Sequence, residues 1–395
     1  ALVAAFLASA CVHTEFERTG RSRLVGGREG LTEILPAVPR GYEEVAVVSV
    51  RADGFATRDR LERHLLRRAA LMGCVAVVDV YVQADAGAQG DGGTVIVWAE
   101  EGTRFEGTVS ARGGTQSGNG GFAEVSGRRN LIFQGKVDLG APNGAVGTLL
   151  LDPDDLVVAD GGDNDLVGTG NTDPQVFEFD ETDDDGNDPA IIDADAVTNA
   201  LANNDVELQA NNTIRVDEKI ESTATSNELR LQSNDDITIN ESIFIPGGRL
   251  AIETEGTVEV IGTDLSETHL STKGSGGGEI FINANNLTME EAFIDGGNVG
   301  VEDAKPFNVD LTGTLDMTDS AIASSAFNAG DAGGVRVIAD AIVLRSSNPD
   351  DPTTIGSRSF SGAKGSSGDI FVDASDISIL GGSWIQSATL VGSLV

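Results

Sequence analysis

One short pattern recurs nine times along this chain and limits the folds that the chain can adopt. Each copy reads small residue, any residue, aliphatic, any residue, aliphatic, and the copies begin at Gly93, Gly121, Gly147, Asn204, Asn227, Gly248, Gly278, Gly333 and Gly368. Alternating aliphatic residues predict strands with one buried face. Successive copies begin 28, 26, 57, 23, 21, 30, 55 and 35 residues apart. We therefore predict a unit of roughly 20–30 residues, the size of one coil of a β-solenoid.

The copies also predict which side chains form the core. The 55-residue and 57-residue steps each fit two coils. Parallel strands should dominate residues 204–380, and the first aliphatic residue of each copy there should point inward, namely Val206, Leu229, Leu250, Ile280, Val335 and Ile370. One coil cannot fold alone, but a stack of coils can. Asparagines at the expected corners (Asn211, Asn212, Asn285 and Asn286) can adopt the left-handed conformation that a corner needs.

Charge divides the chain into two unlike parts. The formal net charge is −37, yet residues 1–84 hold eleven Arg and ten acidic residues, so about −38 falls on the remainder. Both cysteines and both tyrosines also lie in the first part. A strongly acidic surface argues against nucleic acid or anionic lipid as a partner. The contrast suggests a domain fusion or an artificial joining of two sources.

The first eleven residues are apolar and end in a cysteine. Leu7-Ala8-Ser9-Ala10 before Cys11 resembles the lipobox at the end of a secretory signal, with small residues where a signal peptidase admits them. One reading makes residues 1–11 a signal segment and Cys11 a lipidation site. The other reading makes them an ordinary apolar segment.

Residues 12–86 are predicted to form a small α/β domain. Strands are expected over 42–50 and 75–82, and between them Leu61, Leu65, Ala69 and Met72 recur at helical spacing. Thr57 is a suitable N-cap and Gly73 a suitable C-terminal glycine. This βαβ pattern resembles small α/β domains of bacterial envelope lipoproteins, without a diagnostic motif.

Residues 87–395 carry a more specific set of motifs. Gly-Gly-Thr-Val-Ile-Val-Trp-Ala (92–99) is followed by Ser-Ala-Arg-Gly-Gly (110–114), Gly-Gly-Phe-Ala-Glu-Val-Ser-Gly (120–127) and Leu-Leu-Leu-Asp-Pro (149–153). In this order they resemble the large exoproteins of the filamentous-haemagglutinin type, which are exported by two-partner secretion, and the likeness covers roughly residues 90–395. Gly-Asp-Ala-Gly-Gly-Val-Arg-Val (330–337) resembles the repeats of their stalk.

This resemblance implies a right-handed parallel β-helix, exposure on the bacterial surface or outside the cell, and a role in adhesion. It also implies an outer-membrane secretion partner. The family's N-terminal secretion domain, with its Asn-Pro-Asn-type motif, is not found, and residues 1–85 occupy its expected place. The resemblance therefore leaves the export route of this chain open.

An acidic stretch at about 152–195 interrupts the repeat, and we expect an irregular insertion there. Its only candidates for a metal are Asp183, Asp185 and Asn187, which resemble part of a calcium loop. The bidentate Glu of such a loop is missing, because Ile192 stands at its twelfth position. Weak calcium binding is the most that this stretch predicts, and no other cofactor is expected. Residues 194–201 could form a short helix before the next coil.

Little in the sequence points to catalysis. His13, His64 and His269 are the only histidines, and none lies in a recognisable nucleophile motif. The solenoid's bases are scattered, whereas a polysaccharide lyase or hydrolase needs carboxylates gathered in one groove. Trp98 and Trp384 could be carbohydrate-stacking platforms, although coverage by a neighbouring loop is the commoner reason for an outward Trp.

The sequence thus predicts a mainly β protein, a parallel β-helix preceded by a small α/β domain. We expect no catalytic residues and a non-enzymatic, adhesin-like shaft that binds a cell-surface receptor or carbohydrate. The alternative is a carbohydrate-active β-helix enzyme. Because Ile385–Val395 holds no ionisable side chain, we also expect a fragment of a longer exoprotein whose last coil promotes association.

Overall fold

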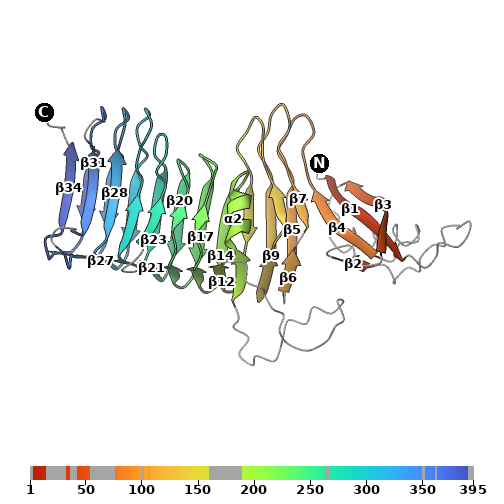
Figure 1. The fold of residues 1–395 in the computed structure, drawn as a ribbon, viewed down its shortest axis with the longest axis horizontal. Helices are drawn as coiled ribbons and strands as arrows, with labels where there is room; N and C mark the ends of the chain where they lie inside the picture. The colour runs from red at the N-terminus through yellow and green to blue at the C-terminus, as the bar shows by residue number, and fades with distance from the viewer. Residues whose placement is uncertain are drawn as a thin grey trace, which may run out of the picture. The chain divides into compact units, whose positions relative to one another are not determined.

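A computed structural model describes residues 3–14, 33–35, 42–53, 76–99, 102–105, 107–159, 189–262, 267–348, 352–360 and 363–389 (Figure 1). The chain divides into two compact units. The first unit comprises residues 1–99, 103–126 and 133–150, and the second comprises 100–102, 127–132 and 151–395.

In the first unit an N-terminal sheet holds the two strands predicted for the α/β domain. They are β3 (Tyr42–Asp53) and β4 (Ala76–Gln83), and β1 (Val3–Thr14) pairs antiparallel with both. Strand β2 (Glu33–Leu35) pairs parallel with β4. The predicted helix between β3 and β4 lies outside the described residues. The returning strand does not pair with the first strand of the βαβ unit, because β1 separates them.

The same unit carries the first coils of the repeat. Strand β4 pairs parallel with β7 (Thr108–Ser110), which pairs parallel with β10 (Lys136–Asp138). A second row is formed by β5 (Thr94–Ala99), β8 (Phe122–Gly127) and β11 (Thr148–Leu151). Strand β6 (Gly102–Phe105) lies mostly in this unit, whereas β9 (Asn130–Phe133) lies mostly in the second unit.

The second unit is a parallel β-helix, as predicted, and the structure shows that it has three sheets. Its first sheet contains, in stacking order, β14 (Asp205–Ala210), β17 (Glu228–Ser233), β20 (Arg249–Thr254), β23 (Glu279–Ala284), β26 (Phe307–Leu311), β29 (Val335–Ile338) and β32 (Ile370–Asp373). Its second sheet contains β13 (Ala190–Asp193), β12 (Leu156–Ala159), β15 (Ile214–Val216), β18 (Ile237–Ile239), β21 (Thr257–Ile261), β24 (Asn286–Glu290), β27 (Thr314–Thr318), β30 (Ala341–Arg345) and β33 (Asp376–Ile379).

The third sheet holds strands of two to six residues. They are β16 (Ile220–Glu221), β19 (Ile243–Phe244), β22 (Thr268–Ser271), β25 (Ala292–Asp295), β28 (Ala321–Ala326), β31 (Thr354–Ser359) and β34 (Trp384–Thr389). Neighbouring strands of all three sheets pair parallel, and all except β12 and β13 come from successive coils.

The core is built from rows of aliphatic side chains in register. Val206, Leu229, Leu250, Ile280 and Val335 are each at most 1% exposed, as predicted. Phe307 occupies the same row and is 1% exposed. Strand β26 therefore supplies the extra coil expected within the 55-residue step. Burying a Val, Leu or Ile side chain contributes roughly 1.5–3 kcal/mol before conformational entropy is subtracted.

The 57-residue step does not contain two coils, so that prediction was wrong. Between β11 and β14 the described residues include no strand of the first sheet. The extra length lies in residues 160–188, which are outside the description, and in β13 and α2 (Ala194–Leu201). Because β12 and β13 pair parallel within the second sheet, the insertion is shorter than the expected 152–195.

Helix α2 confirms the predicted short helix. Its N-cap, Asp193, accepts a hydrogen bond from the backbone N–H of Asp195 at 2.7 Å, which satisfies one of the free donors at a helix start. Val197 and Leu201 are fully buried. The helix contacts β13, β14 and β16. The helix directly follows β13 of the second sheet. In other coils a third-sheet strand occupies this place.

The small first residue of the repeat is explained by close contact between successive coils. A Cβ atom added at Gly248, Gly278 or Gly333 would overlap the backbone oxygen of the preceding coil. Buried hydroxyls join the third sheet to the first beside these glycines. Ser357 Oγ donates to Gly333 O at 3.1 Å and accepts from Gly368 N at 2.8 Å.

The corner asparagines do not adopt the expected left-handed conformation. Among the described non-glycine residues only Glu291 and Asp319 have a positive φ, 48° and 45°. The asparagines instead bond to neighbouring coils, as Asn211 Nδ2 does to Asp154 Oδ1 at 2.7 Å. Their amides thus satisfy polar groups between coils rather than relieving strain within one.

The last described coil differs from the others in burial. Ile370 is only partly buried, contrary to its predicted place in the core. Ile377 and Ile379 are 47% and 44% exposed, while Ile342 and Leu344, one coil earlier in the same register, are 1% and 0% exposed. Side chains in the core register therefore face solvent there.

Candidate interaction surfaces

The sequence-predicted site residues do not converge on one site in the described residues. Asp183, Asp185 and Asn187 lie outside the described residues, as does His64. Cys11 lies within β1, paired with Ala46 of β3 and Val77 of β4, and its lipidation stays a prediction. A signal segment ending at Cys11 would remove most of this strand.

Neither a metal cluster nor a membrane-spanning helix is found where the structure is described. No group of three or more His, Cys, Asp or Glu side chains could hold a metal ion in that part of the chain. No helix there is long and apolar enough to cross a membrane. The candidate interaction surfaces are the outer faces of the sheets.

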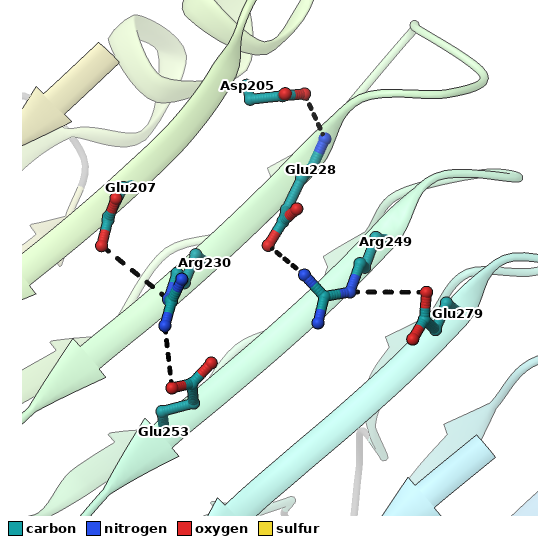
Figure 2. Close-up of polar contacts among 7 residues, drawn as sticks. All are labelled: Asp205, Glu207, Glu228, Arg230, Arg249, Glu253 and Glu279. Carbon is teal, nitrogen blue, oxygen red and sulfur yellow. Dashed lines mark hydrogen bonds and ion pairs between the residues drawn. The ribbon is translucent and has the colours of Figure 1, made fainter. Parts of the chain in front are cut away.

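The outer face of the first sheet carries an ionic lattice that crosses four strands (Figure 2). The Arg230 guanidinium lies 3.8 Å from Glu207 Oε1 and 2.8 Å from Glu253 Oε2, on the strands before and after it. Arg249 bridges its two neighbouring strands in the same way, and lies 2.7 Å from Glu228 and 3.4 Å from Glu279. Each arginine thus ties three successive coils together.

Protonation in this lattice depends on burial and on the excess of carboxylates. Burial, and then the charge of Glu228, raise the pKa of Asp205, against the lowering effect of a hydrogen bond from the Glu228 N–H. Burial also raises the pKa of Glu207, although Arg230 opposes this change. Burial lowers the pKa of Arg249, but Glu228 and the other carboxylates around it outweigh that and raise it overall. These groups pair with one another, which is the pattern of a structural ion-pair network.

The outer face of the third sheet is different, because aromatic rings and cations follow one another along the stack. The ring centroids of Phe244 and His269 are 6.3 Å apart, and those of His269 and Phe293 are 5.6 Å apart. Lys219 Nζ lies 5.4 Å from the Phe244 ring centroid. Ring pairs at these distances are favourable beyond their buried area.

A second group of rings and cations lies on later coils. Phe327 and Phe360 stack at 4.8 Å with an interplanar angle of 9°. Lys273 Nζ lies 3.8 Å from the Phe327 centroid, and the Arg358 guanidinium lies 5.6 Å from the Trp384 ring. We call the outward residues of β19, β22, β25, β28, β31 and β34, together with Lys273, Phe327 and Phe360, the third-sheet face.

One acidic group on this face has an unusual environment. Asp295 stands in outward register, between Ser271 and Ala323 on the adjacent strands, yet is only 6% exposed. Burial raises the pKa of Asp295 to about 6, against the lowering effects of Lys273 and of a hydrogen bond from the Gly297 N–H. Among the described residues, its Oδ1 atom has no hydrogen-bond partner.

Both tryptophans point outward. Trp98 is 50% exposed and Trp384 is 43% exposed, while Val95 and Val97 beside Trp98 are buried. No loop of the described residues covers either ring. His269 belongs to the ring row, and His13 lies in β1.

No protein-family model matches this chain, and no curated protein matches it either.

The third-sheet face was not predicted from the sequence. The strands of this sheet have two to six residues and the turns between them differ in length, so the sequence does not show which rings meet. The stacking of β19, β22 and β25 brings Phe244, His269 and Phe293 together.

Proposed function

We propose that this chain is a non-enzymatic, adhesin-like shaft of a secreted or surface-exposed bacterial exoprotein. One observation supports this proposal most. In the second unit the same three outer faces are presented coil after coil, and one of them carries rings and cations in a row. A repeated surface of this kind suits extended contact with a partner, as in other solenoids.

The motifs at 92–99, 110–114, 120–127 and 149–153 support the same proposal, because their order resembles the filamentous-haemagglutinin type of exoprotein. On this proposal the chain acts outside the cell or on the outer membrane. An outer-membrane partner would export it, and a surface receptor or carbohydrate would bind it. Calcium binding at Asp183, Asp185 and Asn187 would be weak.

Binding to whole cells tests the proposal. The fluorescently labelled chain is titrated onto bacterial and animal cells, with bovine serum albumin carrying the same label as the acidic control. We expect saturable retention of the chain that unlabelled chain displaces. Retention no higher than that of albumin on every cell type would contradict the proposal.

A carbohydrate-active β-helix enzyme is the second candidate, and Asp295 is the observation that favours it. A carboxyl group whose pKa is raised to about 6, near a lysine, is a feature of catalytic acids. Incubation with neutral and acidic polysaccharides, followed by detection of reducing ends and of unsaturated products, separates the two candidates. Turnover that Asp295→Asn abolishes would favour the enzyme.

A further inference from the structure

The third-sheet face combines a strip of small residues with larger side chains on both sides. Ala323 and Ser325 point outward from β28, yet are only 8% and 5% exposed. Gly356 follows Ala323 in register on β31. Phe293 stands beside this strip on β25, and Phe327 directly follows β28. The small side chains of the strip therefore lie between larger side chains, among them aromatic rings.

Two polar groups at this strip are buried without a partner, and they are complementary. Asp295 Oδ1, an acceptor, and Arg358 Nε, a donor, are buried atoms that make no hydrogen bond with any described residue. The Arg358 side chain lies over Gly356, since a Cβ there would be 3.5 Å from Nε. Asp295, Ala323 and Gly356 follow one another on three adjacent strands. Asp295 and the arginine are thus about 10 Å apart along the stack, two strand spacings.

A buried polar atom without a partner costs free energy that a ligand can recover. A ligand that suits both atoms must donate a hydrogen bond at one end of the strip and accept one at the other. It must also present apolar faces to the rings of Phe293 and Trp384. Pyranose rings have hydroxyl groups at their edges and C–H groups on their faces, so a short chain of them meets these requirements.

The cations decide which kind of saccharide fits. Lys273 and Arg358 both stand at this strip, and Asp295 is the carboxyl group buried between them along the stack. Charges elsewhere on the acidic shaft are screened over about 8 Å at physiological ionic strength. A guanidinium binds a carboxylate more strongly than it binds a neutral oxygen. An extended peptide could not add to this sheet as a further strand along the shaft, because the strands between its ends are paired on both sides.

We propose that the third-sheet face between β22 and β34 binds a uronic-acid-containing oligosaccharide. Its sugar rings lie on Phe293 and Trp384, because Phe360 and Lys273 cover the two faces of the Phe327 ring. A hydroxyl group donates to Asp295, and a uronate carboxylate accepts from Arg358. This inference rests on the proposed function and names the class of partner for the same shaft.

The test uses a matched pair of ligands and the full chain. Isothermal titration calorimetry compares an oligogalacturonate hexamer with its carboxyl-reduced counterpart, which keeps the ring chain and loses the charge. Poly-glutamate of similar charge reports attraction to anions alone. We expect the oligogalacturonate to bind at least about tenfold more tightly than the reduced hexamer, the range of one charge-assisted hydrogen bond.

Variants locate the binding. Arg358→Met keeps the stem of the side chain and should bind the two hexamers equally, while Asp295→Asn should weaken both. Arg336→Met is the matched control on the first sheet, where its guanidinium pairs with Asp310, and it should leave both affinities unchanged. Should Arg358→Met fail to fold, as judged by circular dichroism, Lys273→Met replaces it, with the same loss of preference expected.

Three results would overturn this inference: no binding of either hexamer at millimolar concentration, equal binding of poly-glutamate, or unchanged affinities in the folded Arg358 or Lys273 variant and in Asp295→Asn. Cell retention is measured with the same variants. If cells retain the chain but no oligosaccharide binds it, the saccharide inference is rejected and the adhesin proposal stands. If the unmutated chain shows neither saturable cell retention nor oligosaccharide binding, both proposals are rejected.

Discussion

Replacing Asp295 by Asn should change how the stability of this protein depends on pH. Burial raises the pKa of Asp295 from 3.8 to about 6, so the folded protein holds a proton there that the unfolded chain releases. The free energy of unfolding therefore falls as pH rises between about 4 and 6, because the folded state binds more protons in this window. A shift of about two pKa units corresponds to roughly 3 kcal/mol.

The asparagine variant lacks this titration. If the variant loses the hydrogen bond from the Gly297 N–H, its unfolding free energy falls by the same amount at every pH. The raised pKa values of Asp205 and Glu207 affect the stability of the parent and the variant alike. The difference in unfolding free energy, variant minus parent, should thus grow by up to about 3 kcal/mol from pH 4 to pH 7.

Thermal unfolding followed by far-ultraviolet circular dichroism at pH 4, 5, 6, 7 and 8 gives this difference. We expect the unfolding temperatures of the two proteins to move apart by several degrees as pH rises, in favour of the variant. Curves that stay parallel over this range would show that the carboxyl group titrates normally, and the reasoning from burial would be wrong.

Three further changes test the packing, the ionic lattice and the last coil. Ile282→Ala should lower the free energy of unfolding in urea by about 2–5 kcal/mol, because Ile282 is fully buried. Asn283→Ala on the outer face should lower it by under about 0.5 kcal/mol, and equal losses would contradict the stacked core. Arg230→Ala should lose about 1 kcal/mol at low salt and less in 1 M NaCl, and a loss that salt leaves unchanged would rule out an ionic cause. The double variant Ile377→Lys and Ile379→Lys should associate less in sedimentation velocity, because both isoleucines are over 40% exposed. Unchanged association would show that the last coil does not cause it.

The sequence predicted the first and second sheets because their strands bury alternate residues. Val206 to Val335 follow one template, and the 55-residue step left room for the coil that begins at Phe307. The helix at 194–201 was also predictable, since Asp193 caps it and Val197 and Leu201 share one face. These signals are local, so a single sequence reveals them.

The features that the sequence did not reveal depend on register between coils. The 57-residue step looked like two coils because its length allowed two, while β13 and α2 use that length within one. The third-sheet face gathers Phe244, His269 and Phe293 from strands 20–30 residues apart, and no periodic pattern marks them. Asp295 follows Ile294 as any surface residue could, and only the packing around it shows that it is buried.

The central claim is that this chain acts by binding and not by turnover. A single measurement addresses it most directly: equilibrium binding of the labelled full chain to intact cells, with the cell-surface polysaccharide recovered afterwards and sized by gel filtration. The account predicts saturable, reversible binding and polysaccharide of unchanged length. Shortened polysaccharide, or no saturable binding to any cell type, would contradict it.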